Sequence, residues 1–152
     1  MKKTYLFFLM TLLTLSNSSC SKDDDTGEGG NTFSSEIVGK WKYVEQGELD
    51  DNGNFVSYGY ENDPNCWDYT QFNSNHTGED VLHDWGGCNN PEIEYFNWSI
   101  SGNILTLSMG FFEYQYQIME VTDTTLKFSM EAEFEFNGEV EINTYVTHFE
   151  KM

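Results

Sequence analysis

Carboxylates are the commonest side chains in this chain that could bind a metal ion or transfer protons. The chain has 26 aspartates and glutamates, and two segments concentrate them. Asp50-Asp51-Asn52-Gly53-Asn54 has the acidic start of a calcium-binding loop, but its glycine comes too early, and Asn-Gly is a common turn pair. The other segment alternates acidic with apolar residues, as a strand with one face in water does (Glu131, Glu133, Glu135, Glu139, Glu141). We therefore predict no metal site and no acid–base pair in either segment.

The histidines and the later cysteines give no catalytic pattern. His76, His83 and His148 are scattered, and no serine or cysteine stands in a recognisable nucleophile setting. Cys66 and Cys88 could hold zinc together with a histidine, but their spacing matches no zinc motif. We predict a protein that is not an enzyme, has no metal site and requires no cofactor.

The start of the chain has the three parts of a secretory signal peptide. Lys2 and Lys3 precede an apolar run, Tyr5 to Leu15, and small polar residues then lead to Cys20. The run is too short to cross about 30 Å of hydrocarbon as a helix. A cysteine at this point predicts cleavage of residues 1–19 and acylation of Cys20, which anchors the protein to a membrane.

Export decides how the two remaining cysteines should pair. Cys66 and Cys88 are an even pair in an oxidising compartment, so we predict a disulfide between them. In the chain-entropy model, closing the loop between Cys66 and Cys88 stabilises the fold by roughly 3 kcal/mol.

The charge of the mature chain limits its partners. Removing residues 1–19 leaves five lysines, no arginine and 26 acids, a net charge of −21. Such a field repels phosphate backbones, so we predict no nucleic-acid binding. The acidity indicates a soluble surface-tethered protein, or one that attracts cations or a basic partner.

Composition divides the mature chain into a tether and a domain. Residues 20–35 are rich in Ser, Asp, Gly and Thr and contain one aromatic residue, Phe33. They cannot bury enough apolar surface to fold by themselves, so we predict a disordered acidic tether. Residues 36–152 are long enough for one domain with one core, and their many Phe, Tyr, Trp, Val, Ile and Thr residues favour strands.

Period-two alternation marks most of the domain. The clearest example runs from Leu126 to Phe136, with one apolar face and one charged face. Asn137-Gly138 then predicts a hairpin turn. About eight strands are predicted, with a ninth candidate at the end and with 54–60 the most doubtful: 39–48, 54–60, 67–73, 77–84, 93–100, 103–109, 112–121, 125–136 and 139–150. A short helical turn is expected near 34–38.

Short turns between these strands favour one all-β architecture. A meander of this kind closes most simply into an up-and-down antiparallel β-barrel, because closure removes exposed sheet edges. A β-sandwich is the alternative, but its long crossovers have no obvious place among such short connections.

Several segments together resemble the lipocalin-like domain of Bacteroidota lipoproteins. The first strand opens with Gly39-Lys40-Trp41, the Gly-x-Trp that begins the first strand of lipocalins. Further matching segments follow in order: Cys66, Thr70-Gln71-Phe72, Cys88, Trp98 to Leu107 and Phe149-Glu150-Lys151. The sequence Cys20-Ser21-Lys22-Asp23 is similar to the export tag of lipoproteins in that group, which implies the outer face of the outer membrane. Asp123-Thr124-Thr125 resembles the group's short O-glycosylation signal, and a polar turn explains it equally well.

The resemblance also implies roles for three residues at one end of the barrel. In lipocalins the glycine permits close approach of the chain and the tryptophan closes the base of the barrel. A basic side chain of the last strand covers that tryptophan. Here Gly39, Trp41 and Lys151 are the corresponding residues, with a cation–π contact expected between the last two.

The interior of the barrel decides between two functions. Seven residues are candidates for its lining: Trp98, Leu105, Leu107, Tyr114, Tyr116, Phe128 and Met130. They could form an apolar cavity that binds a small apolar or amphipathic ligand, which is the leading hypothesis for function. They could also fill the barrel, and their bulk favours a filled or shallow interior. The protein would then act as a protein-interaction or accessory subunit at the cell surface, with a partner that the sequence does not identify.

Overall fold

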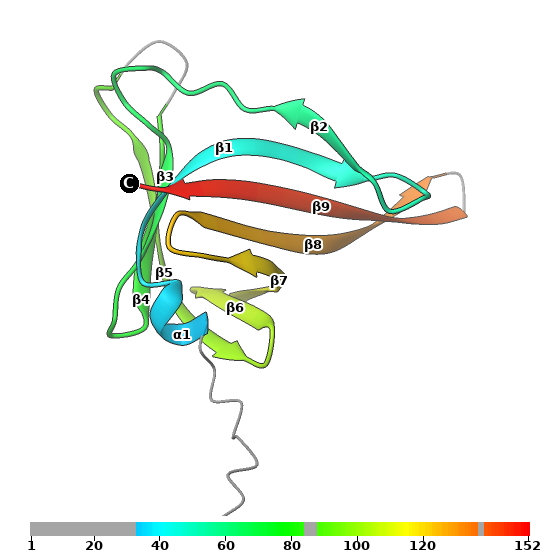
Figure 1. Cartoon of the computed structure of the whole chain (residues 1–152). Coiled ribbons are helices and arrows are strands. Elements are labelled where there is room, and N and C mark those ends of the chain that lie inside the picture. The colour runs from blue at the N-terminus through cyan, green and yellow to red at the C-terminus, as the bar shows by residue number, and fades with distance from the viewer. Residues whose placement is uncertain (1–32, 84–87, 137–138) are drawn as a thin grey trace, which may run out of the picture.

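Nine antiparallel strands form one continuous sheet in the computed structural model, which describes residues 33–83, 88–136 and 139–152 (Figure 1). One short helix precedes the strands in these residues. The elements are α1 (Phe33–Glu36), β1 (Gly39–Leu49), β2 (Phe55–Gly59), β3 (Tyr69–Phe72), β4 (Thr77–Leu82), β5 (Glu92–Ser101), β6 (Ile104–Met109), β7 (Phe112–Val121), β8 (Thr125–Phe136) and β9 (Glu139–Lys151). The predicted signal peptide, Cys20, most of the tether and the Asn137-Gly138 turn lie outside the described residues.

The sheet closes on itself through β1 and β9. Consecutive strands from β3 to β9 pair as neighbours, β1 pairs with β3 near its start, and β1 also pairs with β9. The result is a closed antiparallel barrel of the predicted kind, so the barrel prediction is confirmed and the sandwich alternative is wrong.

The segment predicted as the weakest strand does form one, but outside the barrel. β2 pairs with the far end of β1, from Gln46↔Gly59 to Leu49↔Phe55, on the side where β3 pairs with the start of β1. The Asp50 carboxylate accepts hydrogen bonds from the backbone amides of Asn52 and Asn54 in the connecting turn. This segment is therefore the turn that its Asn-Gly pair predicts.

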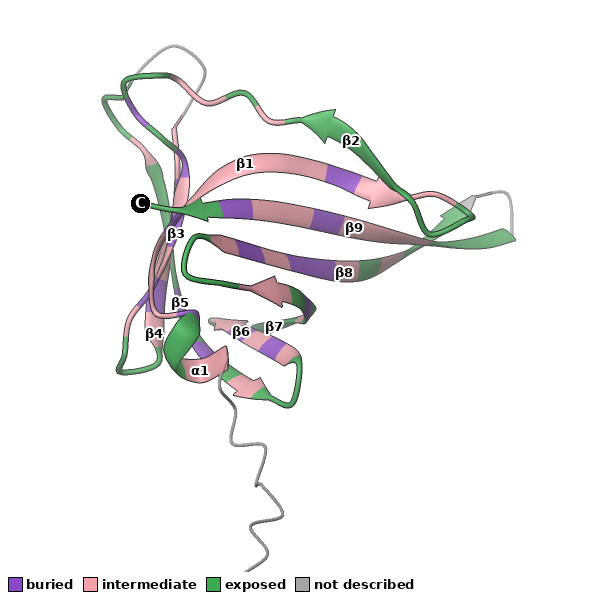
Figure 2. Cartoon of the chain, in the orientation of Figure 1, coloured by how far each residue is buried: buried purple, intermediate pink, exposed green. Residues whose placement is uncertain are grey.

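The core lies at the end of the barrel where β1 begins and β9 ends. Its fully buried side chains include Ile37, Trp41, Phe72, Leu126 and Phe149, whereas Figure 2 shows the start of β9, at the other end of the barrel, as exposed. Short turns join the strands there. Within the described residues, no helix has the length and hydrophobicity needed to cross a bilayer.

At the opposite end the strands separate. Pairing between β7 and β8 reaches only to Gln117↔Ser129, whereas β8 and β9 stay paired as far as Phe136↔Glu139. The long β8–β9 hairpin therefore extends away from β6 and β7, as Figure 1 shows. This separation makes the second end of the barrel the open one.

Candidate functional site

Trp41 closes the base of the barrel. Its side chain has no exposed surface, and its indole Nε1 donates a hydrogen bond of 2.7 Å to the carbonyl oxygen of Ile37. The hydrogen bond satisfies the polar atom of an otherwise apolar ring, as burial of a tryptophan requires. The structure thus places Trp41 where the resemblance to lipocalins puts the closing residue.

Gly39 and Lys151 lie on the outer side of Trp41. The Lys151 Nζ atom lies 4.8 Å from the centroid of the Trp41 ring, within the range of a cation–π contact. Gly39 has a φ of 145°, and a β-carbon there would lie 2.7 Å from Cε of Lys151. Glycine is needed because it accepts the positive φ and leaves room for the lysine.

The predicted disulfide between Cys66 and Cys88 is confirmed. Their Cα atoms are 5.4 Å apart, and the bond joins the chain just before β3 to the chain after β4. It therefore links the two strands at the open end of the barrel. Asp63 also lies beside the sulfur atoms, but the disulfide uses both sulfurs, so they cannot bind a metal as thiolates.

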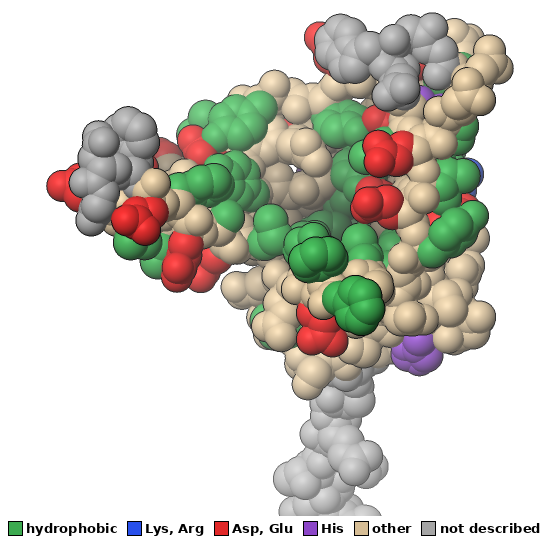
Figure 3. Space-filling model, turned by 180° about the vertical axis from the view of Figure 1, so that it is seen from behind, with side chains coloured by type: hydrophobic (Ala, Val, Ile, Leu, Met, Phe, Trp, Pro, Cys, Tyr) green, Lys and Arg blue, Asp and Glu red, His purple; other side chains and the backbone are tan. Residues whose placement is uncertain are grey.

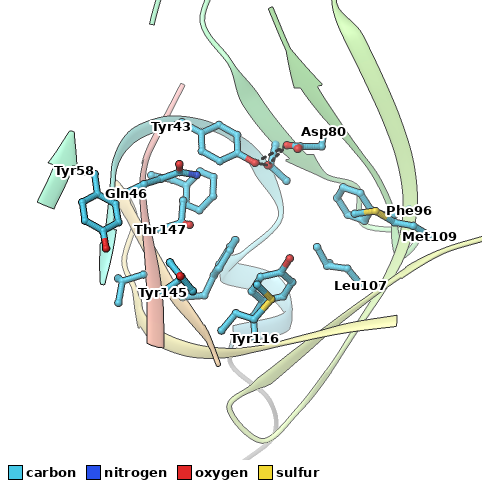
Figure 4. Close-up of a pocket in the computed structure, with 16 residues that line it drawn as sticks. Tyr43, Gln46, Tyr58, Asp80, Phe96, Leu107, Met109, Tyr116, Tyr145 and Thr147 are labelled. Carbon is cyan, nitrogen blue, oxygen red and sulfur yellow. Dashed lines mark hydrogen bonds between the residues drawn. The ribbon is translucent and has the colours of Figure 1, made fainter. Parts of the chain in front are cut away.

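The open end contains a cavity of about 420 Å³, here called the cup (Figures 3 and 4). The space-filling view shows a hollow with hydrophobic side chains and carboxylates around it. Side chains from both halves of the barrel line the cup: Tyr43, Gln46, Gly47, Tyr58, Thr70, Asp80, Phe96, Leu107, Met109, Tyr116, Phe128, Met130, Tyr145, Val146, Thr147 and Phe149.

The expected filled or shallow interior is therefore wrong. Several aromatic side chains outside the predicted lining set, including Tyr95, Phe111 and Phe112, lie on the outside of the barrel or at its rim and take up none of its interior. Small residues such as Gly47 and Thr70 occupy part of the wall instead. The interior therefore has space for a small ligand, and its volume lies in the range that is typical of ligand pockets.

Four of the seven predicted lining residues lie on the wall of the cup: Leu107, Tyr116, Phe128 and Met130. Three do not. Trp98 and Leu105 are buried in the core below the cup, and Tyr114 is partly exposed at the open end of β7. The alternation of each strand gave the correct inward face for Trp98 and Leu105, but it could not give their height along the barrel axis.

Asp80 supplies the carboxylate of the cup. Its Oδ1 atom accepts a hydrogen bond of 2.8 Å from the hydroxyl of Tyr43 and one of 2.5 Å from the hydroxyl of Thr70. The two hydroxyl oxygens lie 3.1 Å apart, so three neighbouring strands converge on one carboxylate oxygen (Figure 4).

Burial shapes the ionisation of this group. Removal from water raises the pKa of Asp80, and the hydrogen bonds from Thr70 and Tyr43 oppose that increase. The negative charges of Glu94 and Asp68 raise the pKa of Asp80 further. Burial and the nearby Asp80 carboxylate also raise the pKa of Tyr43 well above its ordinary value, so this hydroxyl remains a hydrogen-bond donor.

Asp68, a nearby carboxylate that does not line the cup, is fully occupied by the protein. Its Oδ1 atom accepts a hydrogen bond of 2.7 Å from the backbone amide of His83, and its Oδ2 atom accepts one of 2.6 Å from the hydroxyl of Tyr60. Asp68 is also buried, which indicates that it ties the loop before β3 to the end of β4.

Sequence reasoning missed Tyr43, Thr70, Asp80 and Phe96. Period two from Trp41 predicts that Tyr43 points inward, and period two back from Phe72 does the same for Thr70. These signals were present but unused. Asp80 gave no hydrophobic signal, since its inward neighbour on β4 is Gly78, where a β-carbon would lie 2.2 Å from the Phe96 ring.

The closed end, the cup and the strand order together define an antiparallel barrel that can hold a small molecule at one end. The lipocalin-like domain model matches residues 37–128, more than half of the chain, so the chain belongs to the lipocalin-like domain family. No curated protein matches the chain.

Some solved structures are similar to this chain at low sequence identity. A lipocalin-like protein from Bacteroides uniformis is 13% identical, with a TM-score of 0.48, over 77% of this chain and 99% of that one. An uncharacterised protein from Bacteroides eggerthii is 14% identical, with a TM-score of 0.49, over 76% and 99%. The bovine lipocalin allergen Bos d 2 is 16% identical, with a TM-score of 0.42, over 78% and 75%.

Proposed function

We propose that this protein binds a small apolar or amphipathic molecule in the cup and performs no catalysis. The observation that carries the proposal is the cavity of about 420 Å³ inside the barrel, lined by aromatic and aliphatic side chains with a few hydroxyl groups. Such a wall buries apolar surface and orients a ligand through a few polar contacts. The proposal agrees with the general behaviour of lipocalin-like proteins, which bind small hydrophobic molecules.

A second candidate function uses the outside of the rim. Phe111 and Tyr95 are largely exposed, with 103% and 71% relative accessibility, and Phe112 lies beside Phe111 with 67%. Exposed aromatic groups of this kind are typical of protein–protein contacts. A partner subunit at the cell surface could bind there without using the cup.

Two variants of β9 test binding in the cup. We expect Thr147→Trp to weaken binding of the uncharged dye N-phenylnaphthylamine at least tenfold, because an indole on the cup wall occupies the space that the dye needs. The measurement is a fluorescence titration, with the unfolding midpoint as a check on folding.

Thr144→Trp is the matched control, because Thr144 also lies on β9 but does not line the cup. Equal dye affinity in both variants would contradict binding in the cup. Native mass spectrometry of protein purified from its host would then distinguish a retained small molecule from a bound partner subunit.

We also propose that the chain is a lipoprotein anchored through Cys20 and exposed at the outer membrane surface. The signal-like residues 1–19 and the Lys-Asp segment after Cys20 support this location. Cys20→Ser should move the protein from the membrane fraction to soluble fractions, which immunoblotting of separated fractions would measure. Unchanged membrane retention would contradict the anchor.

A further inference from the structure

Charge is distributed unevenly on the wall of the cup. Among the described residues that line it, Asp80 is the one with an ionisable carboxyl group, and no lysine, arginine or histidine accompanies it. A ligand with a carboxylate or phosphate group would therefore meet a negative charge in a low-dielectric cavity and no positive partner.

The geometry leaves half of the Asp80 carboxylate unused. Both hydrogen bonds that it accepts from described residues, from Tyr43 and Thr70, go to Oδ1. Within the same residues Oδ2 accepts none, and Asp80 faces the cup (Figure 4). Asp68 differs, since both of its oxygens are bonded to protein groups. Asp68 thus serves the fold, and Asp80 retains an acceptor for a ligand.

Aromatic side chains line the same cavity as Asp80. Tyr43 lies beside Asp80, and Phe96, Tyr116 and Phe128 belong to the same wall. The Tyr116 and Phe128 rings pack with centroids 4.8 Å apart. Aromatic faces attract cations through their quadrupole, and this attraction strengthens where water is excluded.

Ionisation of Asp80 carries an electrostatic cost that a nearby cation would offset. Burial disfavours the charged form of Asp80, and Glu94 on β5 and Asp68 just before β3 disfavour it further. An opposite charge at Oδ2 favours the ionised form and offsets both effects. The strongly negative protein as a whole also attracts cations.

We propose that the ligand of the cup is an organic cation, a protonated amine with a compact apolar body, whose ammonium group pairs with Asp80. This inference rests on the proposed function, because it requires that the cup binds a small molecule. The inference adds that the ligand is positively charged and that Asp80 is the residue that recognises this charge.

Three ligands with one apolar body and different head groups test the inference. Tryptamine, tryptophol and indolepropionate share an indolylethyl body and carry a cationic, a neutral and an anionic group. Isothermal titration calorimetry of the mature protein should give the order tryptamine, tryptophol, indolepropionate, with at least tenfold between the first and the second. Equal affinities, or tighter binding of the anion, would overturn the inference in the unmodified protein.

Two variants of β4 separate the Asp80 contact from the general negative field. Asp80→Asn keeps the shape of the side chain and should remove the advantage of tryptamine over tryptophol. Glu79→Gln removes the same charge from the next residue, which faces outward and accepts a hydrogen bond from the Tyr69 hydroxyl at 3.3 Å. It should leave the advantage unchanged, and an equal loss in both variants would overturn the role of Asp80.

The outcomes also distinguish this inference from the proposed function. If the dye N-phenylnaphthylamine binds in the cup but tryptamine has no advantage, the cup remains a binding site and the cation inference is wrong. If neither the dye nor any of the three indole ligands binds, the proposed function fails as well.

Discussion

Replacing Trp41 with alanine should lower the free energy of unfolding by about 3 to 5 kcal/mol, the range for removing a large buried aromatic side chain. Trp41 is completely buried, so the substitution leaves a cavity at the base of the barrel. It also removes the donor that bonds to the Ile37 carbonyl oxygen and the ring below the Lys151 ammonium group. Chemical denaturation followed by tyrosine fluorescence or circular dichroism measures the change.

Trp67→Ala is the matched control for this prediction. Trp67 is 38% exposed and contacts the Lys42 ammonium group at 4.8 Å on the outside of the barrel. Its removal should cost less than about 1 kcal/mol, as exposed cation–π contacts usually do. A loss below about 1 kcal/mol in Trp41→Ala would show that the buried indole does not hold the base of the barrel together.

Loss of the Cys66–Cys88 disulfide should have the second largest effect, about 3 kcal/mol of the free energy of unfolding for a closed loop of this length. The bond joins the open-end termini of β3 and β4, whose opposite ends are already joined by the turn between them. The double variant Cys66→Ala, Cys88→Ala would show the loss in urea denaturation. Dye binding in the cup should weaken too, because Thr70 and Asp80 belong to this hairpin.

Reductant provides the internal control for the disulfide. The unmodified protein in reductant should unfold at nearly the denaturant concentration of the double variant, and reductant should not change the double variant itself. If the midpoint of the unmodified protein stays the same after complete reduction, the bond does not constrain the unfolded chain in the way that the entropy model requires.

The strands could be predicted from sequence because their signal is local. From Leu126 to Phe136 the alternation is uninterrupted, and β8 has the predicted bounds. The Gly-x-Trp at the start of β1 also identified the closed end. It is a short motif that can be recognised without knowing the rest of the fold, and the contact between Trp41 and Lys151 agrees with it. Where a side chain must be buried, period two leaves little freedom in the register of a strand.

The cup could not be predicted in the same way, because its volume depends on how far neighbouring strands remain paired. The barrel opens because β7 and β8 stop pairing at Gln117↔Ser129, before either strand ends. The sequence of neither strand indicates where this pairing stops. The position of Asp80 in the cup could not be predicted for a related reason. On an acidic chain a single aspartate in a strand has no distinguishing pattern, and only its contacts with Tyr43 and Thr70 set it apart.

The short helix α1 has a consequence for how the cup would be presented to the surroundings of the cell. Phe33, the first residue of α1, packs against the closed end of the barrel, whereas Gln46, Met109 and Tyr145 surround the opposite end. If Cys20 is acylated as proposed, the residues between it and Phe33 span at most about 45 Å when extended. The lipid would then be attached at the closed end, so the anchor would leave the mouth of the cup free for solutes arriving from the medium.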